Sequence, residues 1–293
     1  MSIASELKIS FKEGGYLTRL IYINAAVFLA VKISLIVCTL FNAPTLWIRF
    51  IEMPASLSVL IYRPWTIISY MFLHTEFLHI IFNLLALYWF GKIFLMFFNQ
   101  KQIVGVYILG GLGGAVIYLM GYNLLPYFAE SVPNAYILGA SASVMAILFA
   151  TVVYSPNYEI RLALIGNVKL KYLGLAFLII DILGITATNA GGSMAHLGGA
   201  AIGWLYALLL KKHNIDISFQ ITQIINFFST FSFTKPKMKV STNSNYKTDE
   251  QWNMERKSKN SRIDEILDKI KKSGYEQLTE DEKKELFDLS NKK

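Results

Sequence analysis

The chain has 293 residues, of which 54% are hydrophobic and only 16% are charged, and its formal net charge is +8. Soluble globular domains carry about 25% charged residues, so the composition excludes an ordinary soluble enzyme and indicates a protein that crosses a membrane several times. The net positive charge points to anionic lipid headgroups rather than to nucleic acid. The single cysteine, Cys38, excludes a disulfide within one chain.

Six apolar stretches have roughly the 20 residues that a helix needs to cross a bilayer. They lie at about 20–41, 77–98, 103–122, 139–157, 169–188 and 195–211. The loop at 42–76 is too apolar for a solvated linker. It is predicted to form a partly helical hairpin at the membrane interface.

Basic residues fall on one side of these predicted spans. The alternate loops at 123–138 and 189–194 contain no lysine or arginine, and only Arg49 and Arg63 break the pattern. By the positive-inside rule, both termini are expected in the cytoplasm, with residues 1–19 as the N-terminal segment. The expected location is a bacterial inner membrane. The basic residues on the cytoplasmic side are Lys8, Lys12, Arg19, Lys101, Arg161, Lys169, Lys171, Lys211 and Lys212.

The character of the chain changes after the membrane domain at 20–212. Residues 213–260 are predicted as an interfacial segment followed by a polar linker. Residues 261–293 are predicted as a small helical module, in which Thr279 and Glu282 have the spacing of a capping box. The module contains no catalytic cluster, so a cytoplasmic partner or a regulatory role is the expectation for it; the alternative is a solvated tail without a role of its own.

Two polar residues lie near the beginning of apolar stretches. Ser141 follows Gly139 at the start of the fourth predicted span, and His196 begins the sixth. A serine and a histidine in hydrogen-bond reach are the minimum apparatus for acyl transfer. Serine beside small residues in a membrane helix more often serves packing, and Ser143 is an alternative nucleophile on sequence alone.

The second predicted span supplies two further polar side chains. His79 and Asn83 are four residues apart and therefore share one face of a helix. With the Ser141 backbone amide they form a plausible set of donors for a developing oxyanion. The alternative is that they form hydrogen bonds between helices.

These motifs, in the order His-x-x-x-Asn, Gly-x-Ser and Ala-His-x-Gly-Gly over residues of about 45–212, resemble the rhomboid intramembrane serine proteases. The resemblance implies an all-α bundle of six transmembrane helices that cleaves membrane-protein substrates in or near their transmembrane segments, without a cofactor or metal. It implies Ser141 as nucleophile, His196 as general base, His79, Asn83 and the Ser141 amide as oxyanion site, and Gly139 and Gly199 as supporting glycines.

Two residues depart from the family pattern. Ala142 follows the serine where the family has glycine, and Met145 stands where many members have a tyrosine on the histidine; its thioether is expected to pack there instead. Asp181 falls near the middle of the span predicted at 169–188. It is therefore expected to be too deep for a catalytic triad, and to be neutral or bonded within its helix.

Two other functions compete with proteolysis. A non-proteolytic relative that binds or chaperones membrane helices would lack the serine or the histidine, and both are present. A transporter with a proton relay through His79, His196 and Asp181 would need polar groups that continue to the cytoplasmic side. The sequence contains no such chain of polar groups. Membrane lipids and transmembrane proteins are the expected partners.

Overall fold

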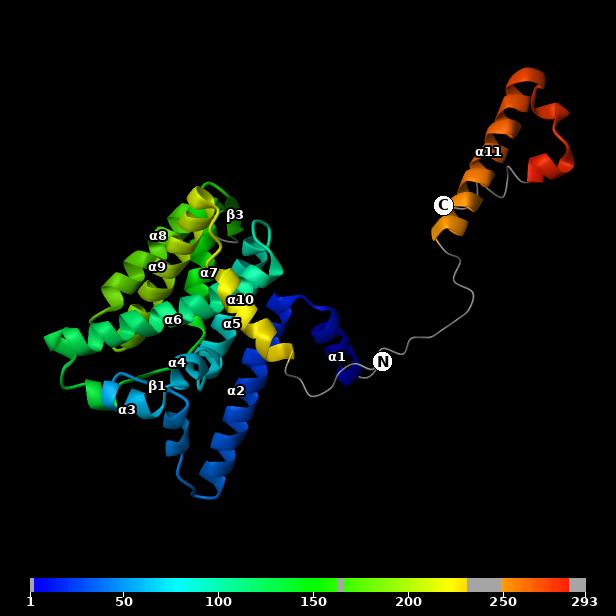
Figure 1. Ribbon diagram of the computed structural model, residues 1–293. Coiled ribbons are helices and arrows are strands. Elements are labelled where there is room, and N and C mark those ends of the chain that lie inside the picture. The colour runs from blue at the N-terminus through cyan, green and yellow to red at the C-terminus, as the bar shows by residue number, and fades with distance from the viewer. Residues whose placement is uncertain (1–2, 163–165, 231–248, 285–293) are drawn as a thin grey trace. The chain divides into compact units, whose positions relative to one another are not determined.

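The computed structural model describes residues 3–162, 166–230 and 249–284. The chain divides into two units, Met1–Ser232 and Phe233–Lys293, which are described separately. The first unit is a helical bundle in which every predicted span is a helix (Figure 1). Its main helices are α2 (Tyr16–Leu40), α5 (Phe77–Phe94), α6 (Gln100–Leu124), α7 (Ser141–Tyr154), α8 (Leu170–Gly184) and α9 (Ala190–His213).

Four helices of the described residues, α2, α5, α6 and α9, are long and apolar enough to cross a membrane. Helix α7 has 14 residues and α8 has 15, fewer than the roughly 20 that a straight span needs. The membrane character of the chain is therefore evident, whereas the count of six spans remains a prediction.

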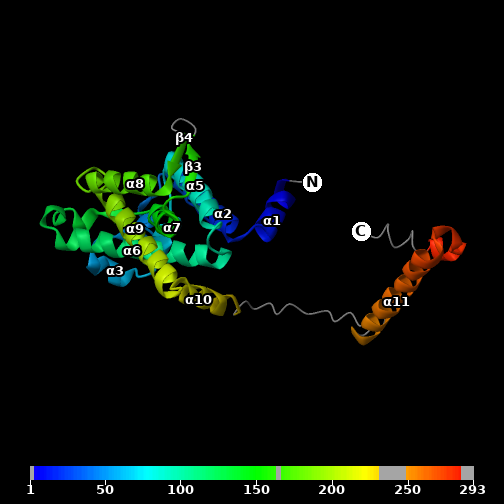
Figure 2. The same cartoon turned by 90° about the horizontal axis from the view of Figure 1, so that it is seen from above.

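Helix α7 occupies the centre of the bundle, among α5, α6, α8 and α9 (Figure 2). Every residue from Ala142 to Val152 is buried. A helix that is apolar on all sides is stable only when other helices surround it. The serine that begins this helix is therefore held by the most enclosed element of the fold.

Small residues bring the neighbouring helices close to α7. A Cβ atom added to Gly199 or Gly203 on α9 would overlap the backbone carbonyl oxygen of Ala142 or Ala146, respectively. From α6, a Cβ atom at Gly114 would lie 2.6 Å from Cβ of Ala142. These contacts are the backbone-to-backbone approach that small-xxx-small patterns allow in membranes.

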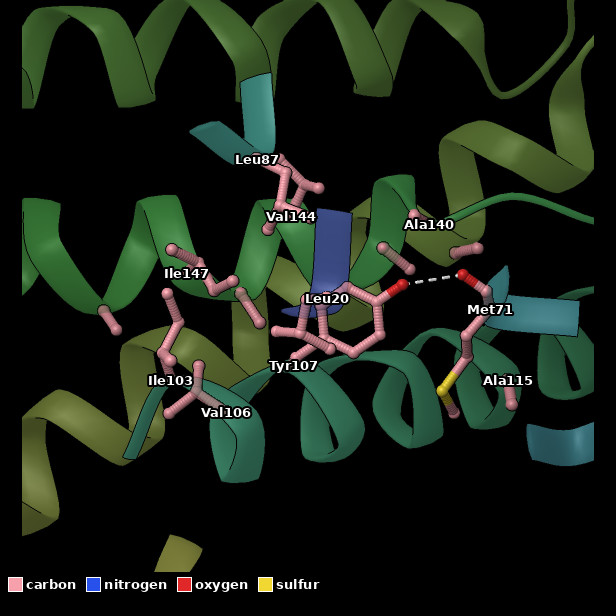
Figure 3. Close-up of a cluster of buried hydrophobic side chains, with 14 of the residues drawn as sticks. Leu20, Met71, Leu87, Ile103, Val106, Tyr107, Ala115, Ala140, Val144 and Ile147 are labelled. Atoms are coloured by element: carbon pink, nitrogen blue, oxygen red, sulfur yellow. Dashed lines mark hydrogen bonds between the residues drawn. The ribbon is translucent and has the colours of Figure 1, made fainter. Parts of the chain in front are cut away.

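Buried side chains fix α6 to α7 and to the segment before α5 (Figure 3). The Tyr107 hydroxyl donates to the backbone carbonyl of Met71 at 2.8 Å, and the Asn24 amide donates to the Tyr107 hydroxyl at 3.1 Å. Ala140 and Val144, on either side of the serine turn, belong to the same cluster. The serine turn is thus anchored in the hydrophobic core.

The loop at 42–76 is partly helical, as predicted. It contains η1 (Leu46–Phe50), β1 (Met53–Pro54), α3 (Leu57–Tyr62), α4 (Thr66–Ser69) and η2 (Tyr70–Phe72). It exposes Leu46, Phe50, Leu57, Ile61, Tyr62 and Trp65. Exposed apolar side chains on one segment are typical of a surface that contacts lipid or another protein.

The structure is mostly helical, as predicted, and also contains two short strand pairs. Strand β1 pairs antiparallel with β2 (Tyr136–Ile137), and β3 (Glu159–Leu162) pairs with β4 (Gly166–Lys169). The β1–β2 pair satisfies backbone groups that no helix provides for. It also ties the apolar loop to the segment that leads into Ser141. The turns η3 (Pro126–Phe128) and η4 (Val132–Asn134) precede β2.

The remaining elements of the first unit lie at its ends. Helix α1 (Ile3–Glu13) precedes α2. Helix α10 (Ser218–Thr230) has 13 residues and packs on α6, where a Cβ atom at Gly105 would lie 2.9 Å from the Ser218 carbonyl oxygen. Its length fits the predicted interfacial segment better than a seventh span.

In the second unit, α11 (Asp249–Ser273) begins before residue 261, so the predicted linker to 260 is too long. The helix stops at Gly274, whose φ of +80° suits glycine, and η5 (Tyr275–Gln277) follows. The predicted capping box is present: the Thr279 amide donates to Glu282 at 3.0 Å. The hydrogen bond from Lys269 to Glu282 is the main cause that lowers the pKa of Glu282 to about 2. Leu286, Phe287 and Leu289 of the predicted module lie outside the described residues.

Candidate active site

One cavity of about 590 Å³ gathers the polar residues that the sequence analysis singled out. Its walls come from α5 and the two residues before it, from β2 and Leu138, and from α7, α8 and the start of α9. The predicted site residues that line it are His79, Asn83, Ser141, Met145 and His196. Residues from four separate helices therefore meet at one hollow, whose other walls are largely apolar.

The backbone places Ser141 as the first residue of α7. The two preceding amides are already used: Gly139 donates to the Tyr70 carbonyl at 2.9 Å and Ala140 donates to Nε2 of His74 at 3.3 Å. The first amides of a helix have no partner within the helix, and no hydrogen bond in the described chain engages the Ser141 amide. This amide remains a free donor at the positive end of the helix dipole.

Gly139 is required by its conformation and by its neighbours. Its φ of +126° is a region that side chains rarely adopt. A Cβ atom there would lie 2.9 Å from Cε1 and 3.1 Å from Nε2 of His79, and 3.8 Å from Oγ of Ser141. The glycine therefore allows the His79 ring to approach the serine hydroxyl.

Asn83 and His79 lie on the α5 wall of the cavity. One hydrogen of the Asn83 amide is donated to the His79 backbone carbonyl at 2.9 Å, which leaves its second hydrogen for a ligand. The His79 ring packs edge-on against the buried His74 ring, with centroids 5.0 Å apart. These contacts fix the positions of both side chains at the cavity wall.

The prediction for Asp181 is wrong. Nδ1 of His196 and Oδ1 of Asp181 are 2.7 Å apart. Helix α8 ends at Gly184 rather than near 188, and α9 begins at Ala190 rather than 195. Asp181 is therefore in the last turn of α8 and His196 in the second turn of α9, so the two side chains meet at the same end of the bundle.

Ser143 and Ala142 point away from the cavity. The Ser143 hydroxyl is fully buried without a hydrogen-bond partner, and the Ala142 methyl group packs toward Gly114 on α6. Neither residue lines the cavity, whereas Ser141 and His196 both do. In the described chain no hydrogen bond joins Ser141 to His196; the one side-chain partner of His196 is Asp181.

Three residues that hold the site had no role assigned from the sequence, although Tyr70 and His74 stand in the segment before the second span that resembles the rhomboid family. Tyr70 and His74 hold the turn before Ser141, and Asp181 contacts His196. The close spacing of His74 and His79 was a further signal for His74. In the described parts of the chain, no group of three or more His, Cys, Asp or Glu residues is arranged to hold a metal ion.

A model of the Rhomboid domain matches residues 61–213, the part of the chain that contains every residue of this cavity. The chain belongs to the rhomboid family. RHOMBOID-like protein 12, mitochondrial, of Arabidopsis thaliana is 32% identical to this rhomboid over 156 residues. The match covers 50% of this rhomboid and 46% of the relative, which is less than half of the relative's length. Residues 246–292 match a family of unknown function (DUF6576).

Proposed function

We propose that this rhomboid is a serine endopeptidase that cleaves peptide bonds in or near transmembrane segments of membrane proteins. The observation that most directly supports this proposal is that one cavity is lined by Ser141, His196, His79 and Asn83. Ser141 supplies the nucleophile and His196 the general base. The cavity has room for a peptide segment together with the water that hydrolysis consumes.

The reaction proceeds through an acyl-enzyme. Oγ of Ser141 attacks the substrate carbonyl carbon while His196 takes the hydroxyl proton. His196 then gives this proton to the leaving amine, the peptide bond breaks, and the acyl group stays on the serine. Water repeats the sequence, with His196 as base, and releases the new carboxylate.

The oxyanion of each tetrahedral intermediate is stabilised by three donors that are already in place: the Ser141 amide, the free hydrogen of Asn83 and the His79 ring. Donors of this kind are effective because they need no reorganisation when charge develops. Their support is the fixed geometry of α5 and of the α7 N-terminus.

We further infer that all six helices lie in the membrane with both termini on the cytoplasmic side. The basic loops support this orientation through the positive-inside rule. The cavity then opens toward the opposite side, because it lies at the N-terminal ends of α5, α7 and α9. A substrate helix must unwind to enter it, so helix-breaking or small residues are expected near the scissile bond.

The proposed function is tested by purified protein in liposomes that also hold a membrane-anchored reporter. The wild type is expected to cut the reporter within or beside its transmembrane segment, and Ser141→Ala to leave it intact. Ser143→Ala is the matched control, since it removes a hydroxyl from the same helix outside the cavity. Stable reporter binding without cleavage by the wild type would indicate a membrane-helix binding protein instead.

Asn83→Ala is expected to lower kcat by roughly 10- to 1,000-fold, because one donor to the oxyanion is lost. KM should change less, since the interaction forms only in the transition state. Asn24→Ala is a close control. Asn24 also donates to the carbonyl four residues earlier, at 2.9 Å, but lies outside the cavity. Equal kcat losses in the two variants would remove Asn83 from the oxyanion site.

A further inference from the structure

A carboxylate is buried against the histidine of the proposed catalytic pair. Oδ1 of Asp181 lies 2.7 Å from Nδ1 of His196, and the Asp181 side chain is only 7% exposed against 24% for His196. Asp181 does not line the cavity. The contact is therefore made at Nδ1 by a residue outside the cavity lining, and it does not involve Nε2.

Such a carboxylate is costly in this setting. A buried carboxylate lowers stability unless it is paired and hydrogen-bonded. Oδ2 of Asp181 is buried and has no hydrogen-bond partner in the described chain. In the described chain, His196 is the only hydrogen-bond partner of the Asp181 side chain. The carboxylate therefore acts on the imidazole ring of His196 or on nothing else.

We propose that Asp181 is a positioning residue for His196, which extends the serine–histidine pair to a third group. Asp181 accepts the Nδ1 hydrogen, so the neutral ring keeps an unprotonated Nε2 that can accept the Ser141 proton. When the proton moves from Oγ to Nε2, the ionised carboxylate balances the charge of the imidazolium. The proton later leaves with the amine product, and Asp181 stays ionised throughout.

The alternative role of the contact is mechanical. Helices α8 and α9 are joined by a short connection, and a hydrogen bond between them could serve only to hold them together. A second alternative is that Asp181 holds His196 away from Ser141, since no hydrogen bond joins those two residues. The three roles predict different outcomes for the same substitution.

The inference rests on the proposed protease function and is tested by Asp181→Asn in the full chain in liposomes. Asparagine keeps the size but can donate to Nδ1, which favours the tautomer with hydrogen on Nε2. We expect kcat to fall by about 10²- to 10⁴-fold with little change in KM, because Asp181 does not touch the substrate cavity. Asp181→Glu restores a carboxylate and should recover part of the rate.

Nitrogen-15 spectra of histidine-labelled protein give a readout that is independent of activity. His196 is assigned by the signal that His196→Gln removes. The neutral ring is expected to carry its hydrogen on Nδ1 in the wild type and on Nε2 in Asp181→Asn. Thr151→Val, which removes a buried hydroxyl of α7 outside the cavity, should change neither the tautomer nor kcat.

Each other outcome overturns the proposal. A normal kcat and tautomer in Asp181→Asn, with or without a lower melting temperature, would leave only the mechanical role. A higher kcat would show that Asp181 restrains His196. If the wild type itself cuts no reporter while the tautomer still switches, the protease function fails but the contact between the two side chains stands.

Discussion

His196→Ala is expected to abolish reporter cleavage as completely as Ser141→Ala, with a loss of kcat on the order of 10⁴- to 10⁶-fold. Each variant removes one half of a single proton-transfer unit, since the serine hydroxyl is a weak nucleophile without its base. The double variant should therefore be no worse than either single one. The measurement is reporter turnover in liposomes, normalised to folded protein.

Comparison of kcat with the melting temperature of these variants separates an effect on catalysis from an effect on folding. Ser141 lies at the cavity surface, so removal of its hydroxyl should leave the melting temperature of the bundle nearly unchanged. Additive losses in the double variant would show that the two residues act in separate steps. A fully active Ser141→Ala variant would exclude it as the nucleophile.

Gly199→Val is expected to reduce activity by about 100-fold or more, because misplacement of catalytic groups by about 1 Å has an effect of this size. A side chain at 199 would overlap the Ala142 carbonyl, which cannot rotate away as a flexible side chain would. Helix α9 must then shift from α7 and carry His196 with it. Overpacking in a core also destabilises by about 1–3 kcal/mol, so the melting temperature should fall together with kcat.

Ala201→Val provides the matched control for this substitution. Ala201 is on the same helix, two residues further along, and is exposed. The same side chain added there meets no neighbouring helix, so activity and melting temperature should remain those of the wild type. If Gly199→Val also behaved like the wild type, the close approach of α9 to α7 would not be what places His196.

Sequence patterns predicted the location of the helices and the set of residues at the cavity. Hydrophobic stretches mark buried segments, and rare polar residues within them mark functional positions. Ser141, His196, His79 and Asn83 therefore stood out, and the structure brings all four to one cavity. The sequence also contains two pairs of glycines four residues apart, Gly110 with Gly114 and Gly199 with Gly203, a spacing that predicts close packing of membrane helices.

The ends of helices were less predictable, and the misplacement of Asp181 follows from that. Residues 185–188 are apolar or small and continue the hydrophobic pattern, although α8 has already ended at Gly184. Hydropathy records solvent preference and not backbone hydrogen bonding, so it does not locate this end. The predicted end of this helix was a few residues too late. Asp181 was therefore expected near the middle of the membrane, whereas it lies beside His196.

Contacts made by loops could not be predicted from the periodicity of the sequence either. The hydrogen bond from Ala140 to His74 and the β1–β2 pair join segments that are far apart in the chain. Neither leaves a repeat in the sequence. In the second unit, the residues from Asp249 to 260 have the polar composition typical of a linker, yet they form the first part of α11 because many of them favour helix.

The shortness of α7 determines how deep the serine lies. Fourteen residues rise about 21 Å at 1.5 Å per residue, against about 30 Å of hydrocarbon in a typical bilayer. If the Tyr154 end of the helix lies level with one face of the hydrocarbon, Ser141 lies about 9 Å inside the other. Under the proposed function, water must reach a depth that lipid would keep dry, and the thickness of the surrounding membrane would then affect the rate of the reaction.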